Sequence, residues 1–210
     1  MRITVFGATG GIGGHVVQQA LAAGHEVTAV VRASSPYEVQ GVEVVRVAGL
    51  TEADPLLDAV DGRDAVISGV GPRTAKSGAV ASGSTRSILA AMTKTGVRRF
   101  VAVSAAPIGP TPPGESFLNR RLLLPMIRAI AADVYADLRV MEADIASSGT
   151  DWTVVRPPKL TKRPLTGKYR TSIGGIVPAG YLIGRADVAH LMLAAVADPA
   201  MVDQTVGVAY

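Results

Sequence analysis

Apolar residues follow two patterns along this chain of 210 residues. Short runs that are apolar throughout alternate with longer segments whose apolar residues recur at helical spacing. The short runs predict β-strands at residues 2–6, 26–31, 42–47, 65–68, 99–104, 152–156 and 203–208. The periodic segments predict helices at residues 12–23, 55–61, 82–95, 122–147 and 185–197. Strands that alternate with helices and are apolar on both faces are typical of a doubly wound parallel sheet, so we predict an α/β fold.

No internal repeat or linker divides the sequence. The chain is long enough to bury a substantial hydrophobic core, and it is short enough for one core to serve all of it. We therefore predict a single domain over residues 1–210. Residues 159–182 are polar and glycine-rich and show little periodicity. We expect them to form a small C-terminal lobe on the substrate side of the sheet rather than a separate domain.

A glycine turn joins the first predicted strand to the first predicted helix. The stretch reads Gly7-Ala-Thr-Gly-Gly-Ile-Gly13, with glycines at positions 7, 10 and 13. In a strand–turn–helix unit such glycines allow a tight turn, a close approach of the backbone to phosphate and close packing of helix on strand. The first amides of the helix then face an anionic pyrophosphate. We therefore predict a dinucleotide site made by Gly7, Thr9, Gly10, Gly11, Ile12 and Gly13.

The end of the second predicted strand favours NADP over NAD. An NAD site usually places an acidic residue there to bind the ribose hydroxyls, but this chain has Arg32, which stands 22 residues after Gly10. The planar guanidinium donates several hydrogen bonds and suits the 2′-phosphate of NADP. We expect the hydroxyls of Ser34 and Ser35 to add hydrogen bonds. The alternative is that Arg32 is only a solvated charge at a strand end.

Two later strand ends contribute to the same predicted site, because ligands of doubly wound sheets lie across the carboxyl ends of the strands. The loop Gly69-Val-Gly71-Pro-Arg73 follows the fourth strand and is expected beside the adenosine-side ribose, with Gly71 and Arg73 binding the cofactor. Ser104 ends the fifth strand and is expected beside the nicotinamide, where it would bind the carboxamide or the acceptor and serve as the catalytic hydroxyl. The alternatives are an ordinary glycine loop and a hydroxyl that caps its own backbone.

The sixth predicted strand is followed by Pro157, Pro158 and Lys159. We expect Pro157 to contact the cofactor, and Pro158 and Lys159 to line the substrate side. A lysine there would attract an acidic substrate. The alternative for Lys159 is a solvated loop residue.

The composition limits the class of partner. Hydrophobic residues make up 48% of the chain and charged residues 18%, which excludes a disordered chain or a coiled coil. The formal charge of +4 and the pI of about 9.6 permit an anionic ligand. The basic residues form no dense run, and only one Trp, five Tyr and three Phe are present for base stacking. We therefore expect no nucleic-acid partner.

Metal, membrane and export signals are missing from the sequence. The chain has no Cys, and its three histidines, at positions 15, 25 and 190, are scattered, so we expect no metal site. The longest apolar runs are too short to span a bilayer, and no basic region followed by an apolar leader is seen. We expect a cytoplasmic protein that contacts no membrane. No dimer helix is identifiable, and we expect a monomer or a weak homodimer.

Several of these motifs together carry a family resemblance. Residues 7–13, 30–32, 100–104 and 156–158 resemble those of the atypical short-chain dehydrogenase/reductases. More narrowly, Val155-Arg-Pro-Pro158, Pro164-Leu-Thr-Gly-Lys-Tyr169 and Asp187-Val-Ala-His190 are similar to the single-domain NAD(P)H-binding group that contains biliverdin-IXβ reductase/flavin reductase. The resemblance covers nearly the whole chain in order.

The resemblance implies a Rossmann-like fold with NADP(H) bound along the strand tips. It also implies an aromatic electron acceptor stacked on the nicotinamide. We therefore expect an NADP-dependent reductase that transfers hydride to a flavin, a tetrapyrrole, a quinone or a similar conjugated small molecule.

Departures from the family pattern leave two alternatives open. The Tyr-x-x-x-Lys pair of typical dehydrogenases is missing, and the nearest approach is Tyr135 with Arg139. Ala105 and Ala106 follow Ser104 where relatives often have further hydroxyls. One alternative is a catalytically silent NADP(H)-binding redox sensor. The other is a pathway epimerase or ketoreductase, which requires an acid–base residue.

Overall fold

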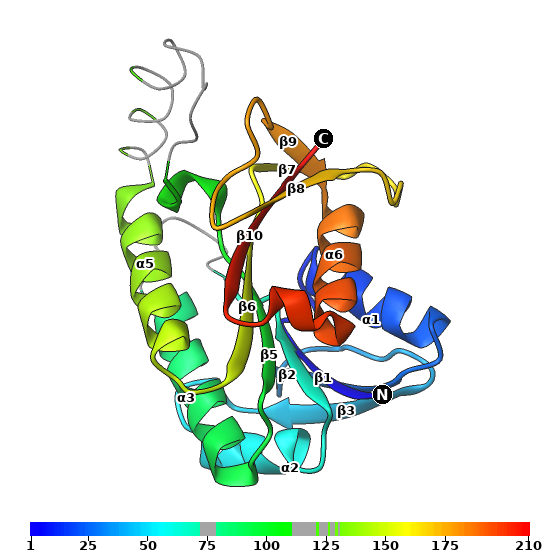
Figure 1. Ribbon diagram of the computed structural model, residues 1–210. Helices are drawn as coiled ribbons and strands as arrows, with labels where there is room; N and C mark the ends of the chain where they lie inside the picture. Colours follow the sequence, from blue (N-terminus) through cyan, green and yellow to red (C-terminus); the bar gives the residue numbers. More distant parts are fainter. Residues whose placement is uncertain (72–78, 111–120, 122–125, 127–128, 130) are drawn as a thin grey trace.

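A mostly parallel β-sheet runs through the protein and carries helices on both faces (Figure 1). The computed structural model describes residues 1–71, 79–110, 121, 126, 129 and 131–210. The strands of the main sheet are β1 (Arg2–Phe6), β2 (Glu26–Arg32), β3 (Val42–Val47), β4 (Ala65–Ser68), β5 (Arg99–Val103), β6 (Asp151–Arg156), β8 (Arg170–Ile173) and β10 (Gln204–Ala209). Their order, β3-β2-β1-β4-β5-β6-β10-β8, contains the order of a Rossmann-like sheet.

Helices occupy the connections between the parallel strands. They are α1 (Gly13–Ala22), α2 (Leu57–Val60), α3 (Val80–Thr95), α5 (Ala132–Ala146) and α6 (Arg185–Ala197), with 3-10 turns at Asp54–Leu56, Ala106–Ile108 and Pro199–Met201. α1 packs against α6 on one face of the sheet, while α3 packs against α5 and α2 on the other (Figure 1). The predicted α/β fold with a doubly wound sheet is confirmed.

Alternate residues of the central strands point into two separate apolar cores. In β1, Ile3 and Val5 face the cluster beneath α1 and α6, whereas Phe6 faces the cluster beneath α2, α3 and α5. In β5, Val101 faces the first cluster and Phe100 the second. All five side chains are completely buried. Coverage of both faces explains why these strands are apolar throughout rather than alternating.

The structure differs from the predicted pattern mainly in residues 159–182. β8 lies antiparallel to β10 at the edge of the sheet, and β7 (Lys159–Thr161) pairs with β9 (Leu182–Gly184) in a separate two-stranded sheet. Most residues of β8 are exposed, so its sequence carries no apolar signal for a strand. α5 begins at Ala132, and the earlier part of the helix expected over 122–147 falls mostly outside the described residues.

Arg99 fixes the last turn of α6 to the sheet. Its guanidinium donates hydrogen bonds to the carbonyl oxygens of Ala195 and Val196 at 2.5 and 3.2 Å. It also donates to the Thr153 hydroxyl of β6 at 2.6 Å. A cation at the carboxyl end of a helix satisfies carbonyls that lack partners and complements the helix dipole.

A buried carboxylate fixes the first turn of α6 to residues 159–182. Asp187 is fully buried and accepts hydrogen bonds from the Thr166 and Gly167 amides at 2.9 and 2.8 Å. It also accepts from the hydroxyls of Thr166 and Tyr210 at 2.9 and 2.6 Å. Burial acts to raise the pKa of this carboxyl, but the hydrogen bonds from Tyr210, Thr166 and Gly167 outweigh it. The net pKa lies below the ordinary value of 3.8.

We predict that Asp187→Asn destabilises the protein by about 3 kcal/mol at neutral pH, because an amide nitrogen would face donors that now bind a carboxylate. The pKa of Asp187 is lower in the folded state, so its stabilisation is complete above the ordinary pKa. It is lost as the pH falls through the folded pKa, because the unfolded chain binds the proton first. Urea unfolding at about pH 7 and from about pH 5 to 3 measures both effects.

Asp58→Asn, on the exposed face of α2, is the matched control and should change neither the stability nor its acid dependence. An equally steep loss of stability in acid for wild type and Asp187→Asn would contradict the assignment.

Candidate functional site

The glycine turn brings β1 and α1 into closer contact than side chains allow. The carbonyl oxygen of Gly7 occupies the place where a Cβ at Gly13 would lie. Gly7 has a φ of +76°, and its own Cβ would meet the Gly69 carbonyl carbon at 2.8 Å. The Gly10 amide donates to the Gly7 carbonyl at 2.8 Å and closes the turn. Glycine is therefore required at positions 7 and 13 for the turn to form.

The turn leaves the first amides of α1 open. Within the described residues, the Gly11, Ile12 and Gly13 amides donate to no backbone carbonyl. α3 differs, because the Asp137 carboxylate of α5 accepts from the amides of Ala81 and Ser82 at 2.9 and 3.1 Å. The start of α3 is thus occupied by a protein carboxylate, whereas the start of α1 is available to an anionic ligand.

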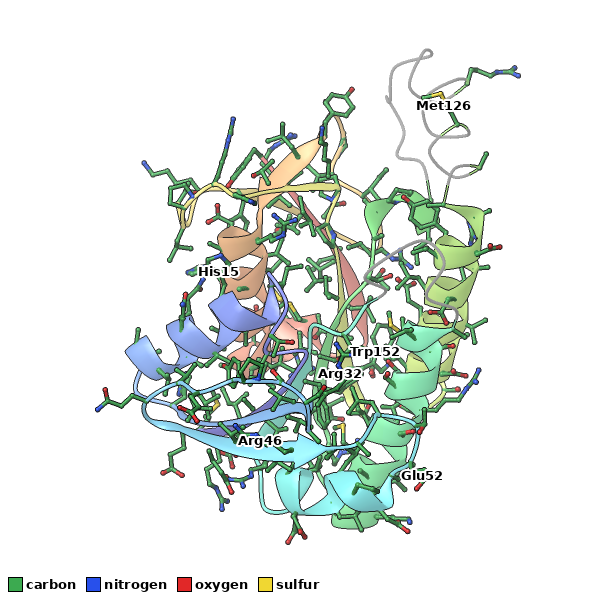
Figure 2. All side chains as sticks on the ribbon, turned by 180° about the vertical axis from the view of Figure 1, so that it is seen from behind. His15, Arg32, Arg46, Glu52, Met126 and Trp152 are labelled. Atoms are coloured by element: carbon green, nitrogen blue, oxygen red, sulfur yellow. The ribbon has the colours of Figure 1, made fainter. Side chains whose placement is uncertain are left out.

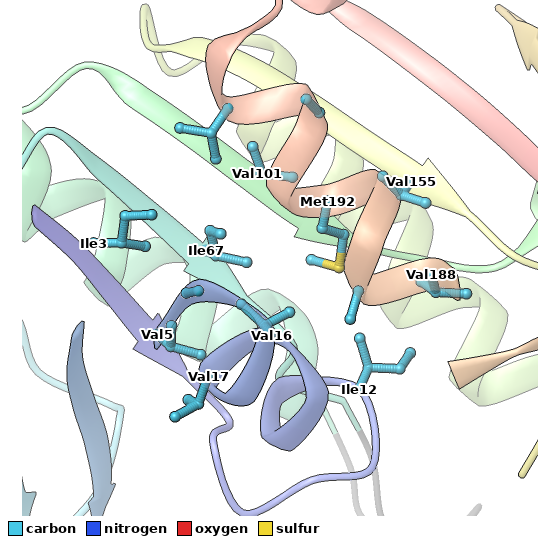
Figure 3. Packing of buried hydrophobic residues seen from close by; sticks show 14 of the residues in the cluster. Ile3, Val5, Ile12, Val16, Val17, Ile67, Val101, Val155, Val188 and Met192 are labelled. Atoms are coloured by element: carbon cyan, nitrogen blue, oxygen red, sulfur yellow. The ribbon is translucent and has the colours of Figure 1, made fainter. Parts of the chain in front are cut away.

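The predicted residues of the glycine turn come together at this point. Thr9, Gly10 and Gly11 are exposed, so a ligand reaches the turn from solvent. Ile12 is buried and points between α1 and α6, where Figure 3 shows it near Val188. Its side chain therefore anchors the helix, and only its backbone faces the site.

Arg32 ends β2 at the same edge of the sheet (Figure 2). Its side chain is exposed and makes no hydrogen bond or ion pair with any described residue. The Ser35 amide donates to the Arg32 carbonyl at 2.8 Å, and this turn holds the half-buried Ser35 beside Arg32. Ser34 is exposed in the same turn. The arrangement offers an uncommitted guanidinium with nearby hydroxyls, as the 2′-phosphate interpretation requires.

The loop after β4, expected at the site as residues 69–73, contributes through its first residue, Gly69. A Cβ at Gly69 would lie 3.2 Å from the Gly13 nitrogen, so Gly69 packs directly on the glycine turn. The predicted Gly71 is exposed and faces open space. Arg73, predicted beside it, lies outside the described residues. Crowding at Gly69 is a property of the folded turn, and no local sequence pattern predicts it.

Ser104 lies where β5 and β6 end together. Its amide donates to the Val155 carbonyl at 2.8 Å, and the Ala106 amide donates to the Pro157 carbonyl at 2.9 Å. The Ser104 hydroxyl oxygen is buried and has no hydrogen-bond partner among the residues that the structure describes. The expected alternative, a hydroxyl that caps its own backbone, is therefore not seen. An unpaired buried hydroxyl is unfavourable unless a ligand completes it.

The three residues after β6 differ in how far they are exposed to solvent. Pro157 is buried, Pro158 is half-buried and Lys159 is exposed. Arg156, which precedes them, donates to both carboxylate oxygens of Glu142 at 3.0 and 2.5 Å. This ion pair is about nine-tenths buried and commits the guanidinium to α5, so Arg156 supports the strand end instead of facing a ligand.

Tyr135 is placed as a packing residue. Its ring packs against the apolar cluster beneath α3 and α5, and burial raises the pKa of its hydroxyl. A catalytic tyrosine that transfers protons near neutral pH needs a lowered pKa instead. Arg139, one turn later, is exposed.

The described part of the chain contains neither a metal-binding cluster nor a membrane-length helix. No three His, Asp or Glu side chains group within it as a metal site would require. None of its helices has the length and apolar character needed to cross a bilayer.

The fold and the open glycine turn together define a dinucleotide-binding protein of the Rossmann type. Residues 7–199 match the sequence model of a NAD(P)H-binding protein family. The chain belongs to this family, and the predicted family resemblance is confirmed. The glycine cradle and the unpaired Ser104 hydroxyl both fit such a cofactor.

Solved structures of similar fold come from several bacteria. A protein from Bacillus halodurans described as an NAD-dependent epimerase/dehydratase is 26% identical, with a TM-score of 0.78 over 100% of this chain and 94% of that one. An NADH-flavin reductase by description, from Streptococcus pneumoniae, is 22% identical, with a TM-score of 0.80 over 100% and 99%. A short-chain dehydrogenase/reductase from Veillonella parvula in complex with NADP is 19% identical, with a TM-score of 0.78 over 100% and 94%. These likenesses show that the chain shares the Rossmann fold of NAD(P)-binding proteins.

We predict that Arg32→Ala weakens NADPH binding about tenfold or more and leaves NADH binding nearly unchanged. The side chain would lose its charge-assisted hydrogen bonds to a phosphate that only NADPH carries. Titration calorimetry with both dinucleotides measures the difference.

Arg46→Ala is the matched control, because the Arg46 guanidinium on the neighbouring strand donates to the Tyr37 carbonyl at 3.0 Å. It should affect the two dinucleotides alike. Equal losses for both dinucleotides in Arg32→Ala would refute the 2′-phosphate role.

Proposed function

We propose that this protein is an NADPH-dependent reductase that acts on a conjugated small molecule such as a flavin, a tetrapyrrole or a quinone. The observation that carries the proposal is the buried, unpaired Ser104 hydroxyl at the end of β5. It lies at the carboxyl edge of the sheet that also carries the open glycine turn and Arg32. When bound, the cofactor supplies the hydride, and the acceptor takes a proton from solvent.

In this proposal the residues of the site act by binding and positioning. The α1 amides would hold the pyrophosphate of the cofactor and Arg32 its 2′-phosphate, and the Ser104 hydroxyl would orient the carboxamide or the acceptor. Pro157 would adjoin the cofactor, and Pro158 and Lys159 the acceptor. Acceptors with extended conjugation need no protein acid at the reacting atom, which agrees with the packed position of Tyr135.

A second candidate is an NADP(H)-binding sensor that catalyses no reaction. Ala105 and Ala106 after Ser104, together with the raised pKa of Tyr135, favour it. An epimerase or ketoreductase would instead show one essential protonating group in its pH–rate profile.

We expect the purified protein to oxidise NADPH when FMN, riboflavin or a simple quinone is supplied. The absorbance of the reduced nicotinamide follows the reaction, and calorimetry measures NADPH binding separately. The description of the streptococcal neighbour as an NADH-flavin reductase makes flavins the first acceptors to assay. Tight NADPH binding without oxidation by any acceptor would overturn the reductase proposal and support the sensor.

We further expect Ser104→Ala to lower kcat/KM about tenfold through loss of one hydrogen bond to the bound ligands. Its melting temperature should stay the same or rise, because the hydroxyl makes no hydrogen bond within the protein. The control is Ser87→Ala, which removes a hydroxyl bonded to the Gly83 carbonyl at 3.4 Å and should leave kcat/KM unchanged. Lower stability of Ser104→Ala with unchanged kcat/KM would show a purely structural serine.

A further inference from the structure

Arg185, the first residue of α6, lies across the glycine turn. A Cβ at Gly11 would be 2.6 Å from the Arg185 Cδ and 2.9 Å from its Nε. No φ in the left-handed region is found at Gly11, so its backbone would accept any residue. A steric constraint thus explains the glycine at position 11, because any side chain there would displace Arg185.

The starts of α1 and α6 lie together in the fold. Figure 3 shows Ile12 of the glycine turn beside Val188 of α6, with Val16 and Met192 in the same cluster. The Gln19 side chain of α1 also donates to the Ala186 carbonyl at 2.9 Å. This packing fixes the position from which the Arg185 side chain reaches Gly11.

The charge of Arg185 has no opposite charge paired with it in the described part of the chain. A cation in the first turn of a helix opposes the helix dipole, which favours anions at that end. Asp187 stands in the same turn, but its carboxylate is committed to Thr166, Gly167 and Tyr210. The half-buried Arg185 side chain makes no hydrogen bond or ion pair with any described residue. An anion bound at the glycine turn would supply the missing partner.

We propose that Arg185 binds the pyrophosphate of the dinucleotide from the α6 side. The pyrophosphate would then lie between the open α1 amides and the Arg185 guanidinium, while Arg32 contacts the 2′-phosphate. This inference rests on the proposed use of the cofactor and adds a residue to its site. The pyrophosphate is common to NADPH and NADH, so Arg185 strengthens the binding of both.

The test is titration calorimetry of NADPH, NADH and ADP-ribose with wild type, Arg185→Gln and Arg139→Gln. We expect Arg185→Gln to weaken all three ligands about tenfold and to reduce the salt dependence of binding. Arg139→Gln removes an exposed arginine from α5 and should leave all three affinities unchanged. Arg32→Ala, by contrast, should weaken NADPH alone.

A double-mutant cycle tests the contact with Gly11. Gly11→Ala should weaken binding in the wild-type background, because its methyl group displaces Arg185. It should weaken binding little in the Arg185→Ala background, where the clash is gone. Fully additive losses would overturn the contact.

Two results separate this inference from the proposed function. If wild type binds both dinucleotides and Arg185→Gln binds them equally well with a lowered melting temperature, Arg185 only packs and the inference fails. If wild type binds neither dinucleotide, the proposed function fails, and this inference fails with it.

Discussion

The carbonyl oxygen of Gly7 stands where a side chain at position 13 would begin, and the rest of the site depends on this contact. It lets α1 start directly against β1, so that the amides of residues 11–13 donate to no backbone carbonyl of the residues described. Gly69, which directly follows β4, packs against the same turn. A backbone held this closely is an anion site before any ligand arrives, which lowers the entropic cost of binding.

Much of this arrangement followed from the sequence. The glycine spacing after an apolar run located the turn, and the two-sided apolar strands predicted a covered sheet, because burial on both faces demands that composition. Arg32 was predicted by counting along a unit whose geometry is regular, and the structure places it exposed at the end of β2. These predictions depend on the local spacing of residues, which can be read directly from the sequence.

Other parts depend on contacts between distant residues, which no local pattern encodes. Asp187 of α6 ties down residues 159–182 by accepting hydrogen bonds from Thr166 and Gly167 of that segment, and it also accepts one from Tyr210. The sequence offered only polar, aperiodic residues there. Arg185 was missed for the same reason, and so was the direct packing of Gly69 on the turn. A weak signal existed for Arg185, since a basic residue at the start of a helix is unfavourable by itself.

α6 is held at both ends by different means. Arg99 binds its last carbonyls from β5, and Asp187 ties its first turn to residues 159–182. The helix therefore lies between the central sheet, which carries the glycine turn, and residues 159–182. Leu165, which precedes Thr166 in this segment, has an exposed side chain that is not one of the donors to Asp187. Substitutions at exposed positions of this segment can therefore change the outer surface of the protein without disturbing the glycine turn.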